Sequence, residues 1–178
     1  MMDVLKVSEG QPEQRVVDAD YAGDDAAPGT VAALWQRIEG YIAHRWQPRP
    51  VTWVLCGSGD WTPPLTPATI DTIEYWSGGD WHTVVQNPTP LGYEFDAGTY
   101  RITATVGEET DPPAAVLEAF NRLAGYLEDE ITLVNSATRE TVNYGNGLSV
   151  SRDRPAAWIA KALQHSGAAD LLRGYRRA

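Results

Sequence analysis

Hydrophobic residues recur at steps of three and four between residues 31 and 46, the spacing of one face of an α-helix. Thr30 is suited to cap the start of this helix, and Pro48 and Pro50 to end it. Gly40 costs a helix interior about 1 kcal/mol relative to alanine, which indicates close packing at that position. The apolar stripe consists of Val31, Leu34, Trp35, Ile38, Ile42 and Trp46.

Between residues 51 and 106 hydrophobic and polar positions alternate with the period of two that is typical of β-strands. The alternation is clearest at 51–55 and 100–106. The segment Ser77-Gly78-Gly79-Asp80 separates two apolar runs, and its glycines can supply the positive φ of a tight hairpin turn. We expect about four to five strands here, with Trp76 and Trp81 facing each other across the hairpin.

A second helix is predicted after residue 110, with Asp111 as its cap and Pro112 in its first turn. Glu118 and Arg122 are spaced to pair on its polar face. Its apolar stripe consists of Val116, Phe120, Leu123 and Leu127.

The C-terminal part of the chain is predicted to hold a turn at 144–147, an extended stretch at 148–152 and a helix from Pro155. Ser166-Gly167 should interrupt that helix, and residues 168–175 should form a last short turn. The fold class is therefore α+β: a helical domain with a β-rich insert and a projecting C-terminal helical tail.

Charge divides the chain into three parts. Residues 1–29 form an acidic, glycine- and proline-broken arm with seven acids and two bases. Residues 30–150 form an acidic body with fifteen acids and six bases, and residues 151–178 form a basic tail with six bases and two acids. The net charge of −10 argues against DNA binding, which depends on neutralising phosphates.

Residues that could carry chemistry are scattered. None of the three histidines has a partner at metal-ligand spacing, and the single Cys56 excludes an internal disulfide. Acidic pairs such as 108–109 fall at the ends of elements. We expect no catalytic residue, no metal and no cofactor. A small enzyme with a site built from scattered carboxylates is the alternative that we consider after the two described below. No signal peptide or membrane span is evident, so we expect cytoplasmic synthesis and no membrane partner.

Seven tryptophans are the unusual feature of the composition. Exposed indoles on a β-face would favour a glycan- or peptide-binding module, whereas anchors in protein–protein contacts would favour an assembly role. Core packing is the favoured interpretation for Trp35 and Trp46 on the first helix. Trp158 stands in a short, basic, proline-led helix far from the other apolar positions, which favours a docking role.

The order of these elements resembles the head–tail connector proteins of siphophages and gene transfer agents. The similar segments are the helix VAALWQRIEGYIAHRW, the hairpin IEYWSGGDWHTVV, the strand TYRITATVG, the helix DPPAAVLEAFNRLAGYLED and the close LLRGYR. The resemblance covers about residues 30–178. The acidic residues 1–29 depart from it, since many members begin with a further helix.

This resemblance implies an adaptor, or head-completion protein, at the virion neck. It would form a twelve-fold ring with other copies of itself, extend the channel through which DNA passes without specific binding, and contact the portal and the stopper or tail-terminator protein. The portal-binding residues implied by position are Trp158, Ile159, Leu163, Leu171, Leu172, Tyr175 and Arg176. Deletion of residues 154–178 is then expected to leave the body folded but to abolish portal binding.

Overall fold

The computed structural model describes residues 1–12, 28–90, 92–132, 139–143, 149–153 and 160–176. The chain divides into two compact units, each made of two segments. The first unit combines Met1–Val17 with Ala43–Asp111, and the second combines Asp18–Ile42 with Pro112–Ala178. Their division differs from the three ranges expected from charge, because each unit joins segments that are distant in sequence.

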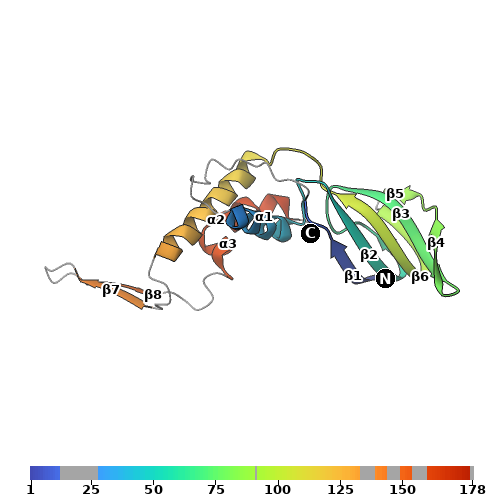
Figure 1. The fold of residues 1–178 in the computed structure, drawn as a ribbon, viewed down its shortest axis with the longest axis horizontal. Helices are drawn as coiled ribbons and strands as arrows, with labels where there is room; N and C mark the ends of the chain where they lie inside the picture. The colour runs from blue at the N-terminus through green and yellow to red at the C-terminus, as the bar shows by residue number, and fades with distance from the viewer. Residues whose placement is uncertain (13–27, 91, 133–138, 144–148, 154–159, 177–178) are drawn as a thin grey trace. The chain divides into compact units, whose positions relative to one another are not determined.

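The first unit is an antiparallel sheet of six strands (Figure 1). The strand order is β1-β2-β6-β3-β4, and the short β5 pairs with β6. Five of the strands come from the segment predicted to be β, and the sixth, β1, comes from the N-terminal arm. The strands are β1 Met2–Glu9, β2 Arg49–Trp61, β3 Ala68–Ser77, β4 Asp80–Val84, β5 Pro88–Thr89 and β6 Gly92–Val106.

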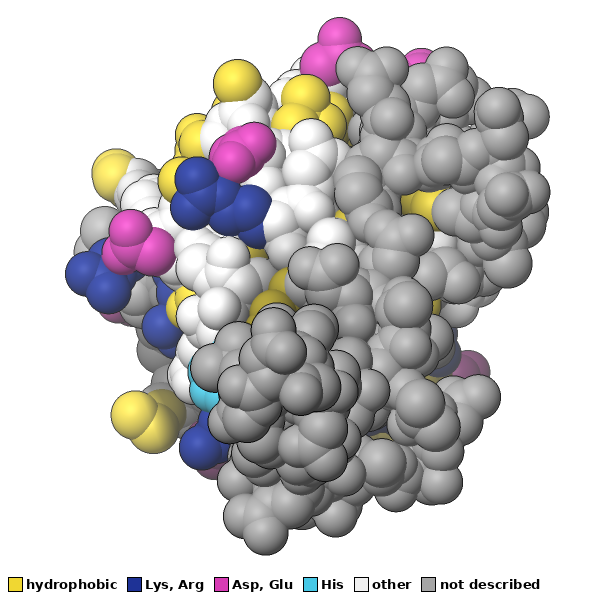
Figure 2. Space-filling model, turned by 90° about the vertical axis from the view of Figure 1, so that its left-hand side faces the viewer, with side chains coloured by type: hydrophobic (Ala, Val, Ile, Leu, Met, Phe, Trp, Pro, Cys, Tyr) yellow, Lys and Arg dark blue, Asp and Glu magenta, His cyan; other side chains and the backbone are white. Residues whose placement is uncertain are grey.

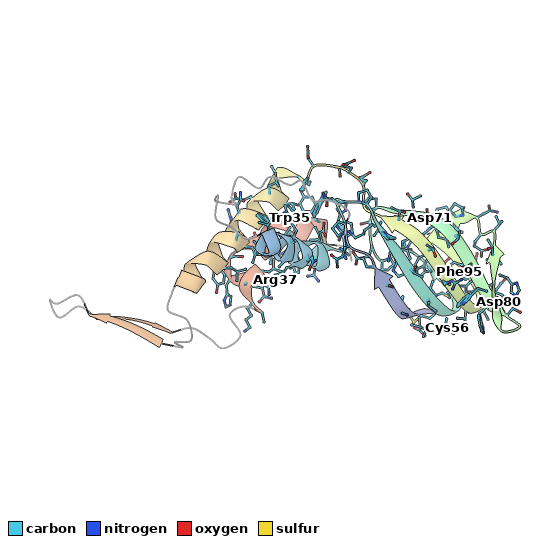
Figure 3. The ribbon with its side chains drawn as sticks, in the orientation of Figure 1. Trp35, Arg37, Cys56, Asp71, Asp80 and Phe95 are labelled. Carbon is cyan, nitrogen blue, oxygen red and sulfur yellow. The ribbon has the colours of Figure 1, made fainter. Side chains whose placement is uncertain are left out.

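The predicted alternation places one face of this sheet in a hydrophobic core. Trp53 and Leu55 of β2 are fully buried, and Trp53 pairs with the equally buried Ile102 of β6. The pairing of β2 with β6 shifts register between Gly57 and Gly59, which marks a bulge, and beyond it Trp61 and Phe95 belong to the same core (Figure 3). A bulge increases the local bend and twist of a strand. Because β2 and β6 bend here, their residues before and after the bulge contribute to the same core.

The predicted hairpin between β3 and β4 is confirmed. Ser77 pairs with Asp80, and the two residues between them, Gly78 and Gly79, have φ of 61° and 88°. Positive φ at both central positions is the requirement of the two-residue turn that matches the twist of the flanking strands. Trp76 and Trp81 are direct cross-strand neighbours, as expected.

The second unit is mainly helical (Figure 1). Within it, α2 contacts α1, α3 and α4, and the strands β7 and β8 pair only with each other among the described strands. The elements are α1 Pro28–Ile42, α2 Ala114–Thr132, β7 Arg139–Asn143, β8 Ser149–Asp153, α3 Ala162–His165, α4 Ala168–Leu171 and a 3-10 turn, η1, at Arg173–Tyr175.

The core of the second unit forms where the two predicted apolar stripes meet. The Trp35 ring of α1 stacks on the Phe120 ring of α2, with 4.7 Å between ring centroids. Ile38 and Leu123 are fully buried on the same two helices. The predicted Glu118–Arg122 ion pair is present on the exposed side of α2, with 2.8 Å between Oε1 and Nε.

The bounds of the first helix differ from the prediction. The helix begins at Pro28 and ends at Ile42, because Ala43 has a φ of 57°, outside the helical region. Trp46 therefore lies beyond the helix, in the segment that belongs to the first unit, and its side chain is buried. Gly40 is exposed, and a Cβ added there would meet nothing within 4 Å, so the expectation of close packing at this glycine was wrong.

The C-terminal tail also differs from the prediction. Gly167, with a φ of 75°, separates α3 from α4, which confirms the predicted interruption. Both short helices contact α2, and Ala162, Ala168 and Leu172 are fully buried. The described part of the tail, residues 160–176, therefore packs as part of the helical unit instead of projecting from it, because its small and apolar residues complete that unit's core.

None of the helices in the described parts of the chain combines the length and the hydropathy needed to cross a lipid bilayer.

Candidate interaction surfaces

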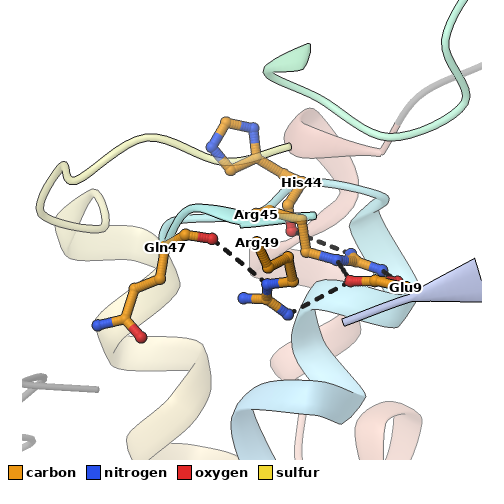
Figure 4. A network of polar contacts seen from close by, with 5 residues as sticks. All are labelled: Glu9, His44, Arg45, Gln47 and Arg49. Carbon is orange, nitrogen blue, oxygen red and sulfur yellow. Dashed lines mark hydrogen bonds and ion pairs between the residues drawn. The ribbon is translucent and has the colours of Figure 1, made fainter. Parts of the chain in front are cut away.

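The C-terminal end of strand β1 is held against the sheet by an ionic cluster of Glu9 with two buried arginines (Figure 4). Glu9 accepts hydrogen bonds from Arg45 Nε at 2.6 Å and Arg45 Nη2 at 3.0 Å, so the Arg45 guanidinium engages both carboxylate oxygens. Arg49 Nη1 lies 3.4 Å from Glu9 Oε1. The next residue, Gly10, donates its N–H to the carbonyl of Pro50 at 2.8 Å.

Electrostatics in this cluster favour the ionised carboxylate. Burial on its own raises the pKa of Glu9, but the hydrogen bonds and positive charges of Arg45 and Arg49 outweigh it, and the net pKa is lowered. Both arginines are more than nine-tenths buried. Removal of the Glu9 carboxylate should therefore destabilise the protein, because two buried cations lose a charged hydrogen-bond acceptor.

The rest of β1 forms the first candidate surface, which we name the β1 edge: Val4, Leu5 and Val7. These three side chains are 46%, 63% and 50% exposed, respectively. Val4 and Val7 lie opposite Leu55 and Trp53, which belong to the core face of β2. The register shift between Val4 and Lys6 inserts Leu5 as an extra residue, which keeps both valines on that face.

The second candidate surface, the hairpin surface, lies on the opposite face of the same sheet and consists of Glu74, Trp76, Trp81 and Arg101. The Trp76 and Trp81 rings lie 5.1 Å apart at 59°, and the Arg101 guanidinium lies 4.6 Å from the Trp81 ring centroid. Arg101 donates to both carboxylate oxygens of Glu74, at 2.6 and 2.7 Å. The arrangement is a cation held against an aromatic pair.

The Glu74–Arg101 pair favours the charged form of both side chains. The hydrogen bonds from Arg101 lower the pKa of Glu74, and the same bonds raise the pKa of Arg101. The sequence predicted the tryptophan pair but missed Glu74 and Arg101, since they meet only through the pairing of β3 with β6. The sequence signal that could have found them is that Glu74 and Arg101 both stand at polar positions of the hydrophobic–polar alternation in their strands.

The exposure of the tryptophans bears on the glycan-binding alternative. Of the six described tryptophans, Trp35, Trp46, Trp53 and Trp61 are buried. Trp76 is 43% exposed and its partner Trp81 is partly buried, with their rings tilted against each other. Stacking on a sugar needs parallel, open ring faces, so the described tryptophans form no flat platform of three coplanar indoles.

The structure separates the seven implied portal-binding residues into different groups. Trp158 and Ile159 lie outside the described residues. Leu163 and Leu171 are half-buried, and Leu172 is fully buried in the helical unit, so its side chain is not accessible. Tyr175 and Arg176 are exposed.

The third candidate surface, the tail surface, is formed by Tyr175 and Arg176 with Tyr41 of α1. The Arg176 guanidinium lies 4.8 Å from the Tyr41 ring centroid, and the Tyr175 side chain is 40% exposed. Sequence analysis did not single out Tyr41, which lies at the edge of the apolar stripe, three residues after Ile38. The tail surface combines an exposed and a half-buried tyrosine ring with a positive charge, a composition enriched in protein interfaces.

Two ion pairs lie on the exposed surface of the helical unit. Arg122 pairs with Glu118, and Arg173 lies 3.6 Å from Asp170. One face of the molecule shows acidic and basic side chains next to each other with hydrophobic ones between them (Figure 2). No cluster of three or more His, Cys, Asp or Glu side chains that could hold a metal ion occurs in the described ranges.

Comparison with known proteins relates this chain to solved structures by fold. No protein-family model matches the sequence, and no curated protein sequence matches it. A chain from a structure described as the neck of an empty GTA particle, computed with C6 symmetry, matches with a TM-score of 0.52 and 16% identity. The match covers 91% of this chain and 95% of that one. This chain shares the fold of that neck chain.

Two further structures show weaker likeness. A chain from the neck of a native GTA particle, computed with C12 symmetry, has a TM-score of 0.45 and 14% identity over 78% of this chain and 79% of that one. A chain from the virion of a native gene transfer agent particle has a TM-score of 0.46 and 13% identity over 93% and 94%.

Proposed function

We propose that this chain is a structural adaptor of the head–tail neck of a tailed phage or phage-like particle. It would form a ring between the portal and the stopper or tail terminator and extend the DNA channel. The observation that carries the proposal is the fold match to the GTA neck chain, because it spans nearly all of both chains. The order of motifs in the sequence points to the same class of protein.

Ring formation is supported by the symmetry of the matched assembly, which was computed with C6 symmetry. A protein in a ring contacts its neighbours on two different surfaces, and several exposed apolar patches are available for such contacts. A ring of six and a ring of twelve copies both require two different contact surfaces on each subunit. The number of copies in the ring is measured by the electron microscopy experiment described below.

A channel lining is supported by the charge of the chain. Residues 30–150 carry nine more acids than bases, and a surface with that excess repels phosphates. DNA could then pass without sticking. We propose no catalytic step, cofactor or metal for this role, since it requires only shape, charge and protein contacts.

Portal contact is assigned to the tail surface together with Trp158 and Ile159. Tyr175 and Arg176 are the exposed members of the set implied by the sequence, and aromatic and arginine side chains dominate the energetics of interfaces. Leu172 instead acts as the anchor that holds these residues on the helical unit, since it is fully buried.

The proposal is tested by mixing the purified chain with the portal protein of the same particle and imaging the complex by electron microscopy. A ring of this chain on the portal is expected, with residues 160–176 at the contact. Absence of any ring on the portal, with both proteins folded, would contradict the adaptor role.

Point variants test the contact better than truncation. Deletion of 154–178 would remove Ala162, Ala168 and Leu172 from the helical core, so we now expect this deletion to destabilise the helical unit as well as to affect portal binding. Tyr175→Ala combined with Arg176→Gln should weaken portal binding in a sedimentation assay. Arg122→Gln, which also removes one exposed positive charge, is the matched control and should bind normally.

A further inference from the structure

We infer that the β1 edge accepts the β7–β8 hairpin of a neighbouring copy of this chain, so that the ring closes by strand addition. The inference rests on the proposed ring and names the surfaces that join its subunits. It begins from the distribution of exposed apolar side chains. Among the residues that the structure describes, four of the seven large exposed hydrophobic residues fall in the first seven positions: Met1, Val4, Leu5 and Val7.

Strand β1 offers both kinds of unsatisfied surface that a strand can offer. It pairs with β2 on one side and with no described strand on the other, so alternate N–H and C=O groups point outward along its free side. Val4 and Val7 continue the core face of the sheet, yet about half of each side chain stays exposed. An added strand would pair the backbone and cover both valines.

The free side of β1 suits a short partner. The bulge at Leu5 interrupts the regular register, which resumes from Lys6 to Glu9. The Glu9 cluster holds that end of the strand against Arg45 and Arg49. A bulge and a lysine discourage long, open-ended edge pairing, so the regular stretch from Lys6 to Glu9 offers room only for a short strand.

The β7–β8 hairpin fits as this partner. Its two strands have five residues each and pair only with each other among the described strands. An isolated two-stranded hairpin is marginally stable in water, so it gains most from joining a larger sheet. The hairpin belongs to the second compact unit, whereas β1 belongs to the first. The surface that donates the strand and the surface that accepts it are therefore different. Contacts of that head-to-tail kind generate rings.

Charge favours the same pairing between copies. The hairpin leads directly into residues 151–178, which carry six bases and two acids. Strand β1 begins residues 1–29, which carry seven acids and two bases. Docking of one segment on the other would bring a basic and an acidic sequence of neighbouring copies together, and their attraction weakens as salt screens it.

A photo-cross-linking experiment on the full chain tests this interface without assuming a register. Leu5 is replaced by p-benzoylphenylalanine in a Cys56→Ser background, and protein labelled with ¹⁵N is mixed with unlabelled protein at up to millimolar concentration. Illumination should join residue 5 to the tryptic peptide 140–152, in pairs that mix the two isotopes. The same amino acid at Val85, which is 91% exposed on the same unit, is the control and should give no such product.

A second measurement uses the edge itself. Val7→Lys should reduce the cross-link yield by at least about tenfold, because a charge replaces an apolar side chain in the contact. Val85→Lys is the matched substitution and should leave the yield unchanged, with folding of both variants checked by circular dichroism.

Two results would overturn the inference. One is the absence of mixed-isotope products at every concentration, including the case in which all cross-links join residues of the same isotope. The other is mixed-isotope products that map outside 139–153. Normal portal binding together with either of these results would leave the proposed adaptor role intact and remove only this interface.

Discussion

Single residues fasten elements that are far apart in the sequence. One carboxylate, Glu9, connects the end of β1 to two buried arginines that follow α1 in the chain. Buried arginines are costly without negative partners, and Glu9 supplies one. At the residue scale, Glu9 therefore adds an ionic contact to the backbone pairing that holds β1 on β2.

Glu9→Gln should lower the free energy of unfolding by about 2 kcal/mol, because charge-assisted hydrogen bonds to buried arginines are lost. Urea unfolding followed by circular dichroism measures this change. Glu118→Gln is the control: its pair with Arg122 is half exposed, and such helix pairs contribute only about 0.3–0.5 kcal/mol. Equal effects of the two substitutions would contradict the assignment.

The same carboxylate predicts a pH dependence. Its pKa in the folded chain is lowered, so its contribution to stability is complete above the unfolded value of about 4.3 and is lost as pH falls through the folded pKa. The stability difference between wild type and Glu9→Gln should be constant near neutral pH and should shrink in acid below that value. A stability difference that grows in acid would mean that folding raises the pKa of Glu9, which contradicts the prediction.

Leu172 supplies the residue-scale test of the tail. Leu172→Ala should cost about 2–5 kcal/mol, because it leaves a cavity in the helical core. Tyr175→Ala, three residues later and exposed, should change stability by less than about 0.5 kcal/mol. Thermal unfolding of both variants distinguishes a packed tail from one that projects.

At the scale of elements, glycines in different conformations have opposite consequences. Gly40 lies inside α1 with open space where a Cβ would stand, whereas Gly79 holds a φ of 88° in the β3–β4 turn. The first glycine weakens its helix, and the second is required by its turn.

Gly40→Ala should therefore stabilise the chain by about 1 kcal/mol, the difference in helix propensity between the two residues. Gly79→Ala should destabilise it, because alanine is strained at positive φ. Chemical denaturation of the pair measures both. Destabilisation by Gly40→Ala would mean that this face of α1 is packed after all.

At the scale of the whole molecule, the chain builds two cores. One lies in the β unit around Trp53 and Ile102, and the other lies in the helical unit around Trp35 and Phe120. Each unit is assembled from two segments, so the chain leaves one unit and returns to it.

Hydrogen exchange should resolve these two cores. Leu172→Ala should speed amide exchange in α2 with little change in β2 and β6, whereas Ile102→Ala should do the reverse. Mass spectrometry of peptic fragments measures both. Equal acceleration throughout the chain by either variant would show that the units unfold together.

Local patterns in the sequence determined much of this architecture. The helix stripes, the alternation of the strands and the Gly78-Gly79 turn depend on neighbouring residues, so the two long helices, the β insert and the tryptophan pair could be predicted. Tyr175 and Arg176 were implied instead by the resemblance of the closing segment to head–tail connector proteins.

Only the tertiary structure decided how distant segments combine. The union of Glu9 with Arg45 and Arg49, of Glu74 with Arg101, and the burial of Leu172 depend on which segments meet in space. Periodicity carries no information on that choice, since an apolar stripe fits any complementary surface. For the same reason the sequence marked residues 1–29 as an arm, and only the pairing with β2 made its first strand the exposed edge of a sheet.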